Sequence, residues 1–537
     1  MQTPVVMPLL WHMIDREMPR DNGYLYRPDN RKMPRTGLPY FDGECRWLAA
    51  YDFEPGKITI YDPVWNKCEI GGQEGDEVLL ELSDNALVRR LLNVEQLTLD
   101  RLTQTIPATA EFSRYEHMWG SVVFVREMLD KYAPETDSRT KLILQLRAFV
   151  SDLGHTAGSH RGDWMFQGMS GPENQHDNEL MHLLDVSGIT EILTRHSIDP
   201  AEVVFPDIED WIERPAPDLC VDRVDYASRE MKRWLNFTTQ IEFATRPEAF
   251  KLIDNQLVMA NHKHALSFAK GFLLLPTEHW NEPVHRLMLH LDQELVKRIF
   301  TADGPGLVAS FMDGPDDYHP RDYMYTVDRD ITFEMRFRDP FLNSVRPLME
   351  DIAQAKRRIS AWERRHQLQN FFSEFDKPKA FPDPLKPYEY PYDQSLNIVP
   401  GNINIIEVDK QEDVEDFGEH PESLDFFLPP MKPRAVDPLY LDEQGSVRRL
   451  SETDSDYADL LKQQAAILKR AYVARLYLNP EVKARIEQGL EENAAKWPEA
   501  LTRPRMGADR FRILINDAAN LAINGSFVVL MGDSQYR

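Results

Sequence analysis

The stretch SRTKLILQLRAFVSDLGHTAGSH, residues 138–160, begins as an amphipathic helix and ends among residue types that bind metal ions. Its apolar residues recur three and four positions apart until Gly154, which predicts a helix that ends there. Asp152 and two histidines then follow within nine residues, and Ser151 stands where a second nitrogen ligand could be expected. The stretch is therefore a metal site, an altered metal site or a loop that is rich in histidine.

Helical spacing extends well beyond this stretch. In the first 300 residues it predicts helices at 85–97, 111–132, 138–155, 176–186, 187–196, 221–240, 244–275 and 283–301. Alternating β-formers indicate a short strand or hairpin at 57–70, and we expect 77–82 to pair with it. Further helices are predicted at about 342–370, 456–477 and 480–495. The expected fold class is mainly α, with a small N-terminal β element and a C-terminal helical extension.

Composition shifts along the chain predict five parts. A segment rich in Pro, Gly and Asn precedes the helical patterns, and a stretch dense in proline and acidic residues interrupts them. We expect an irregular N-terminal segment (1–56), a helical core (57–301), a helical extension (302–372), a Pro/acid-rich arm or linker (373–450) and a C-terminal helical region (451–537).

The charge balance bears on the kind of partner. The chain has 62 Lys and Arg against 88 Asp and Glu, a formal net charge of −26. Such a chain repels a polyanion unless it carries a basic patch, and no long run of Lys and Arg is present. Polymeric nucleic acid is therefore disfavoured, whereas a small phosphorylated molecule needs only a few arginines and a metal ion.

Cysteine usage and hydropathy bear on location. The three cysteines lie far apart without a CxxC pair, which disfavours a disulfide framework and a zinc ribbon. No window approaches about 18 uninterrupted apolar residues, and no basic segment precedes the short apolar run at the start. We expect a cytoplasmic protein with no membrane partner.

Three predicted helical segments offer side chains of the metal-binding type: His117 on the first, Asp152 followed by His155 and His160 on the second, and Asp222 and Asp225 on the third. Helical bundles build metal sites from ligands that project inward from neighbouring helices. One imidazole with carboxylates suits a divalent ion such as Mn, Mg, Fe, Ni or Zn. Such an ion polarises a phosphoryl oxygen and activates a bound water. On these residues alone, ordinary packing or solvation of each side chain is the competing interpretation.

The order of six motifs adds a family resemblance. The motifs are YDPVWN (61–66), SDNALVRRLLNVEQL (83–97), ATAEFSRYEHMWG (108–120), SDLGHTAGSH (151–160), QHDNEL (175–180) and CVDRVDYASRE (220–230). In this order they resemble the HD-domain phosphohydrolases, specifically the deoxynucleoside triphosphate triphosphohydrolase branch. The resemblance covers 57–230 well, 231–301 weakly and nothing beyond. It implies an HD-domain helical bundle and metal-dependent hydrolysis of a nucleotide (dNTP-like) or related small phosphate ester.

The resemblance also implies a metal site. It assigns metal ligands to His117, Asp152 and Asp222, and it places Ser151 where the family has a histidine. Serine is a weak, neutral ligand, so we expect lower affinity and a preference for hard, oxygen-binding ions. Two alternatives are that His155 supplies the missing nitrogen and that no metal binds.

The remaining roles that the resemblance implies concern the substrate. Histidines around the phosphates, or acting as the general acid, fall on His155, His160 and His176, and Asp177 would tune His176. Contacts to phosphate, sugar or base fall on four further side chains: Arg114, Arg223, Tyr226 and Arg89.

One segment departs from the family pattern. Where the family has a basic helix, this chain reads FLLLPTEHWNEPVHR (272–286), so that Glu278 or Glu282 would face the phosphates. This departure and Ser151 favour an alternative to the enzyme: a catalytically degenerate protein that serves as a nucleotide-binding or protein-interaction module. A third interpretation is a different substrate, with the C-terminal arm shaping its site. Relatives form oligomers, so we also expect a homo-oligomer.

Overall fold

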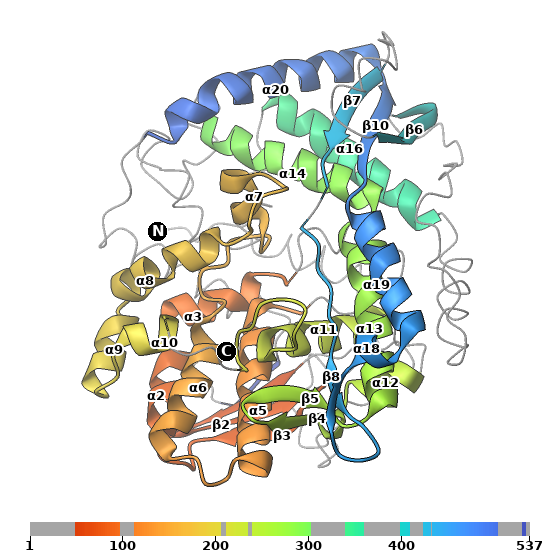
Figure 1. Cartoon of the computed structure of the whole chain (residues 1–537). Coiled ribbons are helices and arrows are strands. Elements are labelled where there is room, and N and C mark those ends of the chain that lie inside the picture. Colours follow the sequence, from red (N-terminus) through yellow and green to blue (C-terminus); the bar gives the residue numbers. More distant parts are fainter. Residues whose placement is uncertain are drawn as a thin grey trace, which may run out of the picture.

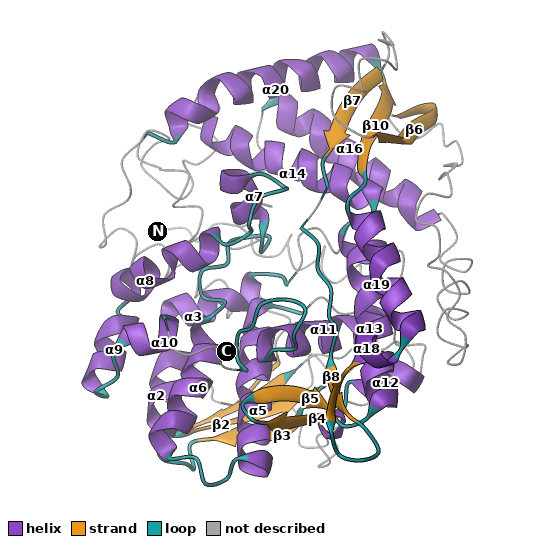
Figure 2. Ribbon diagram, viewed as in Figure 1, coloured by secondary structure: helices purple, strands orange, loops and turns teal. Residues whose placement is uncertain are grey.

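The fold is known from a computed structural model, which describes residues 49–96, 112–205, 211–234, 239–301, 339–358, 398–408, 423–430, 432–502 and 529–532. Helices account for about 58% of the described residues, and the strands form small sheets at opposite ends of the molecule (Figures 1 and 2). The expected mainly-α class is confirmed. That the helices form an HD-domain bundle stays a prediction.

The N-terminal sheet has the strand order β11-β1-β2-β3. Its strands are β1 (Ala50–Glu54), β2 (Lys57–Asp62), β3 (Asn66–Ile70) and β11 (Val529–Gly532), and β11 pairs with β1 in parallel. The hairpin expected at 57–70 is present as β2 and β3. Residues 77–82, which we expected to pair with it, instead lie in helix α2 (Asp76–Ser83). Val78, Leu79 and Leu82 are buried at helical spacing, and the carboxylate of Asp76 accepts hydrogen bonds from three preceding backbone amides.

Most of the helices that follow form the lower body of the molecule in Figure 1, while α7 (Arg161–Gln167) lies higher, beside α14 (Pro283–Thr301). They are α3 (Ala86–Arg90), η2 (Leu91–Asn93), α5 (Arg114–Tyr132), α6 (Ser138–Val150), α7 (Arg161–Gln167), α8 (Gln175–Ser187), α9 (Ile189–Arg195), α10 (Pro200–Val204), α11 (Val221–Trp234), α12 (Thr239–Ala244) and α13 (His262–Leu274). The helix expected at 244–275 begins only at His262. A hairpin of β4 (Phe250–Ile253) and β5 (Gln256–Met259) precedes it, because Asp254 and Asn255 take positive φ angles and form its turn.

The upper body is a second helical layer joined to a sheet. It contains α14 (Pro283–Thr301), α16 (Pro340–Arg358) and α20 (Pro480–Ala500) with strands β6 (Ile398–Val408), β10 (Ala471–Leu478) and β7 (Ser423–Leu428) in the order β6-β10-β7. The helix expected at 456–477 ends at Leu468, where α19 (Ser455–Leu468) stops. The following AYVARLYL is a fully paired central strand, because its β-branched and aromatic residues are buried between two neighbours.

The predicted arm at 373–450 contains regular structure in its described part. Besides β6 and β7, it includes β8 (Leu439–Leu441), β9 (Val447–Arg449) and the start of α18 (Leu450–Thr453). Strands β8 and β9 extend the β4-β5 hairpin into a four-stranded sheet, so this region packs on the core. The five domain boundaries stay predictions, and residues 302–338 and 359–397 lie outside the described residues. No helix among the described residues is long and apolar enough to cross a membrane.

One buried ion cluster joins the sheet to two helices. Arg229 of α11 is 1% exposed, and its guanidinium contacts three carboxylates. Nη1 is 3.0 Å from Glu116 of α5 and Nε is 2.8 Å from Asp225 of α11, while Nη2 donates to Asp62 at the end of β2. Because a buried guanidinium without partners would be very costly, these contacts fix how the three segments approach one another.

Gly120 leaves the space that this cluster needs. A Cβ atom at this position of α5 would lie 1.7 Å from Nη2 of Arg229 and 2.5 Å from Oδ1 of Asp225. We therefore expect Gly120→Ala to lower the free energy of unfolding by about 3 kcal/mol, since it displaces a buried charge from its partners. Denaturant unfolding of the purified protein measures this change. Gly72→Ala is the control because its Cβ would meet open space, and equal stability of the two variants would contradict the prediction.

Candidate active site and metal centre

His117 is held so that one ring nitrogen is fixed and the other faces two carboxylates. It lies in the first turn of α5, whose N-cap is Ser113. Its Nδ1 is 2.6 Å from Asp225, a carboxylate that Arg229 already holds. Its Nε2 is 3.3 Å from Oδ2 of Asp152 and 3.0 Å from Oδ1 of Asp222. Nδ1 therefore carries the proton toward Asp225 when the imidazole is neutral, which leaves the Nε2 lone pair for a cation.

The three side chains that we call the triad, His117, Asp152 and Asp222, fit a divalent ion. One ligand atom of each lies within 4.8 Å of the others. Two ligands at about 2.1 Å from one octahedral cation are about 3.0 Å apart, close to the spacing seen around Nε2. Burial alone would lower the pKa of His117, but Asp152, Asp222 and Asp225 raise it to about 10. The proton on Nε2 of His117 compensates the negative charge of the two carboxylates that it faces, and a bound cation would replace this proton. The structure thus brings the predicted ligands together, and that they bind a metal stays a prediction.

Ser151 lines the cavity beside the triad but does not join it. It caps the C-terminus of α6, and its Oγ donates to the carbonyl of Ala148 at 3.3 Å. His155 does not take the place of the missing histidine. Its Nε2 lies 3.2 Å from Oδ1 of Asp152, and its ring stacks on His176 at 3.9 Å between centroids. In this structure His155 belongs to a second cluster.

That second cluster consists of His155, His160 and His176, gathered around Asp163. Asp163 is buried in α7, and its Oδ2 is 2.8 Å from Nδ1 of His160 and 2.9 Å from Nδ1 of His176. It also accepts a hydrogen bond from the backbone amide of His176. We did not predict this residue. Its position three residues after His160, at helical spacing, is the sequence signal that could have identified it.

Asp163 orients His176, and Asp177, which we expected to tune this histidine, makes a smaller contribution. The side chain of Asp177 is 60% exposed and lies 3.5 Å from Nε2 of His176. Burial by itself would lower the pKa of His176, but Asp163, with smaller contributions from Asp177 and Asp152, raises it to about 9. Burial lowers the pKa of His155 well below its ordinary value, an effect that Arg114 and His176 strengthen. The cluster thus pairs a protonated imidazole with a neutral one.

Arg114, which we expected at the substrate phosphates, braces the site instead. Its Nη1 is 2.6 Å from Oδ2 of Asp152, and its Nε is 3.1 Å from the hydroxyl of Ser159. The side chain is only 4% exposed. Burial would raise the pKa of Asp152, but Arg114, His155 and His117 hold it well below its ordinary value. Arg114 therefore keeps Asp152 ionised and in place.

Of the other predicted substrate residues, Arg223 and Tyr226 line the cavity. The guanidinium of Arg223 donates to the backbone carbonyls of Arg214, at 3.2 Å, and of Asp218. It therefore supports the loop beside the cavity. The ring of Tyr226 lies 5.9 Å from that of Trp280 and 6.2 Å from that of His117, so an aromatic wall adjoins the triad.

That Arg89 contacts the substrate stays a prediction. Its guanidinium pairs with Asp84 on the protein surface, and Arg89 is not among the residues that line the cavity. The neighbouring Arg90 is fully buried and donates to the carbonyls of Leu153, at 2.9 Å, and His155, at 2.7 Å. Successive helical residues point about 100° apart, so only one of the two arginines can face the site. Arg90 supports the backbone turn that carries the motif.

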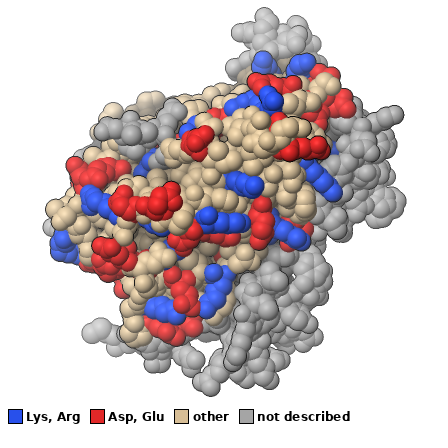
Figure 3. Space-filling model, turned by 60° about the horizontal axis from the view of Figure 1, so that its bottom comes forward, with Lys and Arg blue, Asp and Glu red and all other residues tan. Residues whose placement is uncertain are grey.

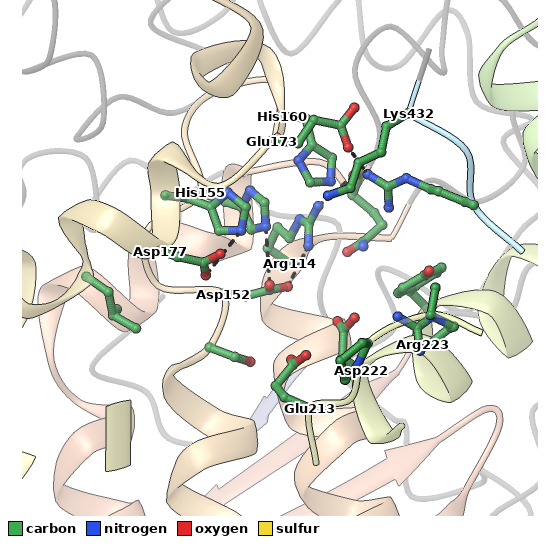
Figure 4. Close-up of a pocket in the computed structure, with 18 of the residues that line it drawn as sticks. Arg114, Asp152, His155, His160, Glu173, Asp177, Glu213, Asp222, Arg223 and Lys432 are labelled. Carbon is green, nitrogen blue, oxygen red and sulfur yellow. Dashed lines mark hydrogen bonds and ion pairs between the residues drawn. The ribbon is translucent and has the colours of Figure 1, made fainter. Parts of the chain in front are cut away.

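The cavity has a volume of about 780 Å³ and is lined by Asp152 and Asp222 of the triad and by the three histidines of the second cluster. Figure 4 shows Asp152 at its centre, Asp177 on one side, and Arg223 and Lys432 on the other. Lys432 and Arg434 reach it from the segment between β7 and β8, which we did not predict. Trp280 and Asn281 reach it from the π-helical turn η4 (Leu275–Trp280) and the residue after it.

The described acidic residue of the segment 272–286, Glu282, does not act as expected. The carboxylate of Glu282 accepts hydrogen bonds from the amides of Val284, at 3.2 Å, and His285, at 3.0 Å. It therefore caps the N-terminus of α14 instead of facing a phosphate. The side chain of Glu278 lies outside the described part of the structure.

The Asp163–His176 pair generates a pH prediction. Asp163→Asn should lower the pKa of His176 from about 9 toward 6.5, because it removes the carboxylate nearest the imidazole. Since the folded-state pKa is raised, the pair stabilises the protein fully below about pH 6.5 and loses this effect as pH rises through about 9. Titration of the His176 ring signals by NMR measures the shift. Asp177→Asn is the control, and a larger shift from this variant than from Asp163→Asn would contradict the assignment.

Ser151 generates a second prediction. Ser151→His should tighten the binding of Mn by about tenfold or more, because it adds a nitrogen ligand beside Asp152. Ser151→Ala, which removes only the bond to the Ala148 carbonyl, should leave the affinity unchanged. Competition with a chelating dye measures both constants. Unchanged affinity in Ser151→His would show that this position does not face the triad.

Comparison with known proteins finds partial similarity. No family model matches the chain. It is 30% identical over 179 residues to the uncharacterized protein YdhJ of Bacillus subtilis, an alignment that spans 33% of this chain and 49% of that protein. It is 26% identical over 227 residues to the metal-dependent phosphohydrolase cns2 of Cordyceps militaris, spanning 40% of this chain and 61% of that protein. The chain thus spans about half to three fifths of the length of these curated relatives.

Similar solved structures include two of low sequence identity. A hypothetical protein from Aquifex aeolicus is 15% identical, with 80% of this chain and 98% of that chain aligned at a TM-score of 0.45. A phosphohydrolase from Bacteroides thetaiotaomicron is 13% identical, with 78% of this chain and 99% of that chain aligned at a TM-score of 0.44.

Proposed function

We propose that this protein is a metal-dependent phosphohydrolase of the HD-domain superfamily that acts on a nucleotide or a related small phosphate ester. The observation that carries the proposal is the triad: Nε2 of His117 faces Asp152 and Asp222, while Asp225 holds its Nδ1. The histidine cluster lies in the same cavity. The similarity to a relative named as a metal-dependent phosphohydrolase supports the same function.

The chain supplies orientation and protons around the cation site. When bound, a divalent ion would polarise a phosphoryl oxygen and acidify a water. Asp225 fixes the ring of His117, and Arg114 fixes Asp152. The pKa of His176, raised to about 9, keeps this imidazole protonated near neutral pH, so it is the group that can donate a proton to a leaving oxygen.

The shape of the cavity favours a substrate of nucleotide size. Its volume of about 780 Å³ lies in the range of sites for small organic ligands. Tyr226 and Trp280 offer aromatic faces to a planar group, and Lys432 offers a cation to an anionic one. The face drawn in Figure 3 has acidic and basic side chains interspersed, without a continuous basic stripe, in keeping with a small substrate.

Metal analysis combined with one substitution tests the proposal. The protein should contain a stoichiometric divalent ion after incubation with Mn, and it should hydrolyse at least one member of a panel of nucleotides and phosphate esters. Asp152→Asn should lower both metal content and hydrolysis, the latter by about 100-fold or more, because it removes a charged ligand. Asp459→Asn is the control, since Asp459 is exposed and pairs only with Lys462 in the described residues.

Two outcomes would count against the proposal. Absence of a stoichiometric ion would favour the competing interpretation, a catalytically degenerate nucleotide-binding or protein-interaction module. Ser151 in place of the family's histidine is the residue that suggests this interpretation. A protein that binds metal but hydrolyses no member of the panel would keep the metal centre and reject the hydrolase.

A further inference from the structure

An extended segment from the C-terminal half of the chain passes along the cavity. We call residues 429–437 the strap, and all of them except 431 are described. The strap runs from β7 in the upper body to β8 in the lower body (Figure 1). Prolines at 429, 430 and 433 limit the backbone angles that it can adopt. Its middle residues, from Lys432 to Ala435, line the cavity.

Both ends of the strap are tied to the core through backbone groups. The carbonyl of Pro429 accepts from Arg286 at 3.2 Å, and that of Pro430 accepts from Ser170 at 2.9 Å. At the other end, the amide of Asp437 donates to the carbonyl of Pro217 at 2.8 Å. These anchors hold the residues between them against the cavity.

Arg434 fixes the middle of the strap. Its guanidinium pairs with Oε2 of Glu173, whose Oε1 also accepts from the indole of Trp164 at 3.0 Å. It also lies over the ring of Trp280, 5.8 Å from the centroid. Glu173 is 6% exposed, so the charge of Arg434 is neutralised by a buried carboxylate and is already used within the protein.

Lys432 differs from Arg114 and Arg434, the two cations of the cavity that pair with a buried carboxylate. Arg114 pairs with Asp152, Arg434 pairs with Glu173, and Arg223 donates to two carbonyls. Nζ of Lys432 donates to the carbonyl of Pro172 at 2.7 Å, and within the described residues no carboxylate forms an ion pair with it. An ammonium group has three donors, so at least one remains for a ligand.

The surroundings of Lys432 favour an anion. Its side chain is exposed, and Figure 4 shows it entering the cavity on the side where His160 and Glu173 lie. Partial burial of the ammonium group, and then the neighbouring Arg434, lower the pKa of Lys432, while Glu173, Asp163 and Asp177 act in the opposite direction. Among the described residues none of these carboxylates forms an ion pair with Nζ, so an anion in the cavity would add a negative charge in direct contact with it.

We propose that Lys432 binds a phosphate group of the substrate, so that the strap completes the substrate site from the C-terminal half of the chain. A lysine ammonium is a compact point charge that suits a phosphate oxygen. The inference rests on the proposed function for the identity of the ligand as a phosphate compound. In this inference Lys432 supplies to the substrate a positive charge that the segment 272–286 does not supply.

The competing interpretation is that Lys432 only ties the strap to Pro172. Three variants of the full chain separate the two: Lys432→Gln, Lys432→Arg, and Lys462→Gln as a matched surface control. Lys462 is exposed and pairs with Asp459, away from the cavity lining. The dissociation constants of inorganic phosphate, pyrophosphate and Mn are measured by calorimetry for each, with phosphate and pyrophosphate measured both with and without Mn.

We expect Lys432→Gln to weaken the binding of pyrophosphate by about tenfold or more, because a charged hydrogen bond is lost. The dissociation constant of pyrophosphate for Lys432→Arg should stay within about threefold of that of the unsubstituted protein, and Lys462→Gln should not change this constant. The affinity for Mn should be equal in all the variants. If the binding of inorganic phosphate is weakened as well, Lys432 contacts the phosphate group beside the triad. If only the binding of pyrophosphate is weakened, Lys432 contacts a second phosphate group.

Other results would overturn the inference. Lys432→Gln that binds both anions as tightly as the unsubstituted protein would show that Lys432 makes no substrate contact. Loss of Mn affinity or of thermal stability together with anion binding would show that it only positions the strap. A protein that binds neither anion has no such site. If the protein binds the anions but not Mn, the proposed function is rejected. The anion measurements without Mn would still decide the role of Lys432.

Discussion

The structure depends on one buried guanidinium that is shared by three carboxylates. Arg229 contacts Asp62, Glu116 and Asp225, which come from a strand end and from two helices. None of these charges could be buried alone without a large cost in free energy, so the segments must meet where the charges compensate one another. Asp225 also holds Nδ1 of His117. The geometry of the core therefore decides which nitrogen of His117 faces the cavity.

A similar arrangement recurs at three groups of the site, each of which has a buried partner that orients it. Asp225 orients His117, Arg114 orients Asp152, and Asp163 orients His176. In a buried environment such pairs interact more strongly than in water, so they fix both the position and the protonation state of the group. The site thus combines carboxylates that stay ionised with an imidazole whose pKa is raised to about 9.

The C-terminal half of the chain contributes to this site as well as to the fold. Strands β8 and β9 extend a hairpin of the core, and the strap between β7 and β8 carries Lys432 and Arg434 into the cavity. These cations lie opposite a segment, 272–286, whose described acidic side chain Glu282 is used to cap a helix. Arg114 and Arg223 of the helical core also line the cavity, and the strap adds two further cations from a region far away in the sequence.

Sequence by itself determined the features that depend on neighbours three or four residues apart. These are most of the helices, the hairpin at 57–70, and the motifs that carry His117 and Asp152. It failed at 77–82, where the apolar residues have helical spacing and form a helix instead of the expected strand. It also failed at 471–478, where pairing with two neighbouring strands overrides the helical pattern. Only the tertiary structure decided that Arg90 supports the backbone turn of the motif and that the strap lines the cavity. Burial and charge compensation between distant segments set these features, and local spacing contains no record of them.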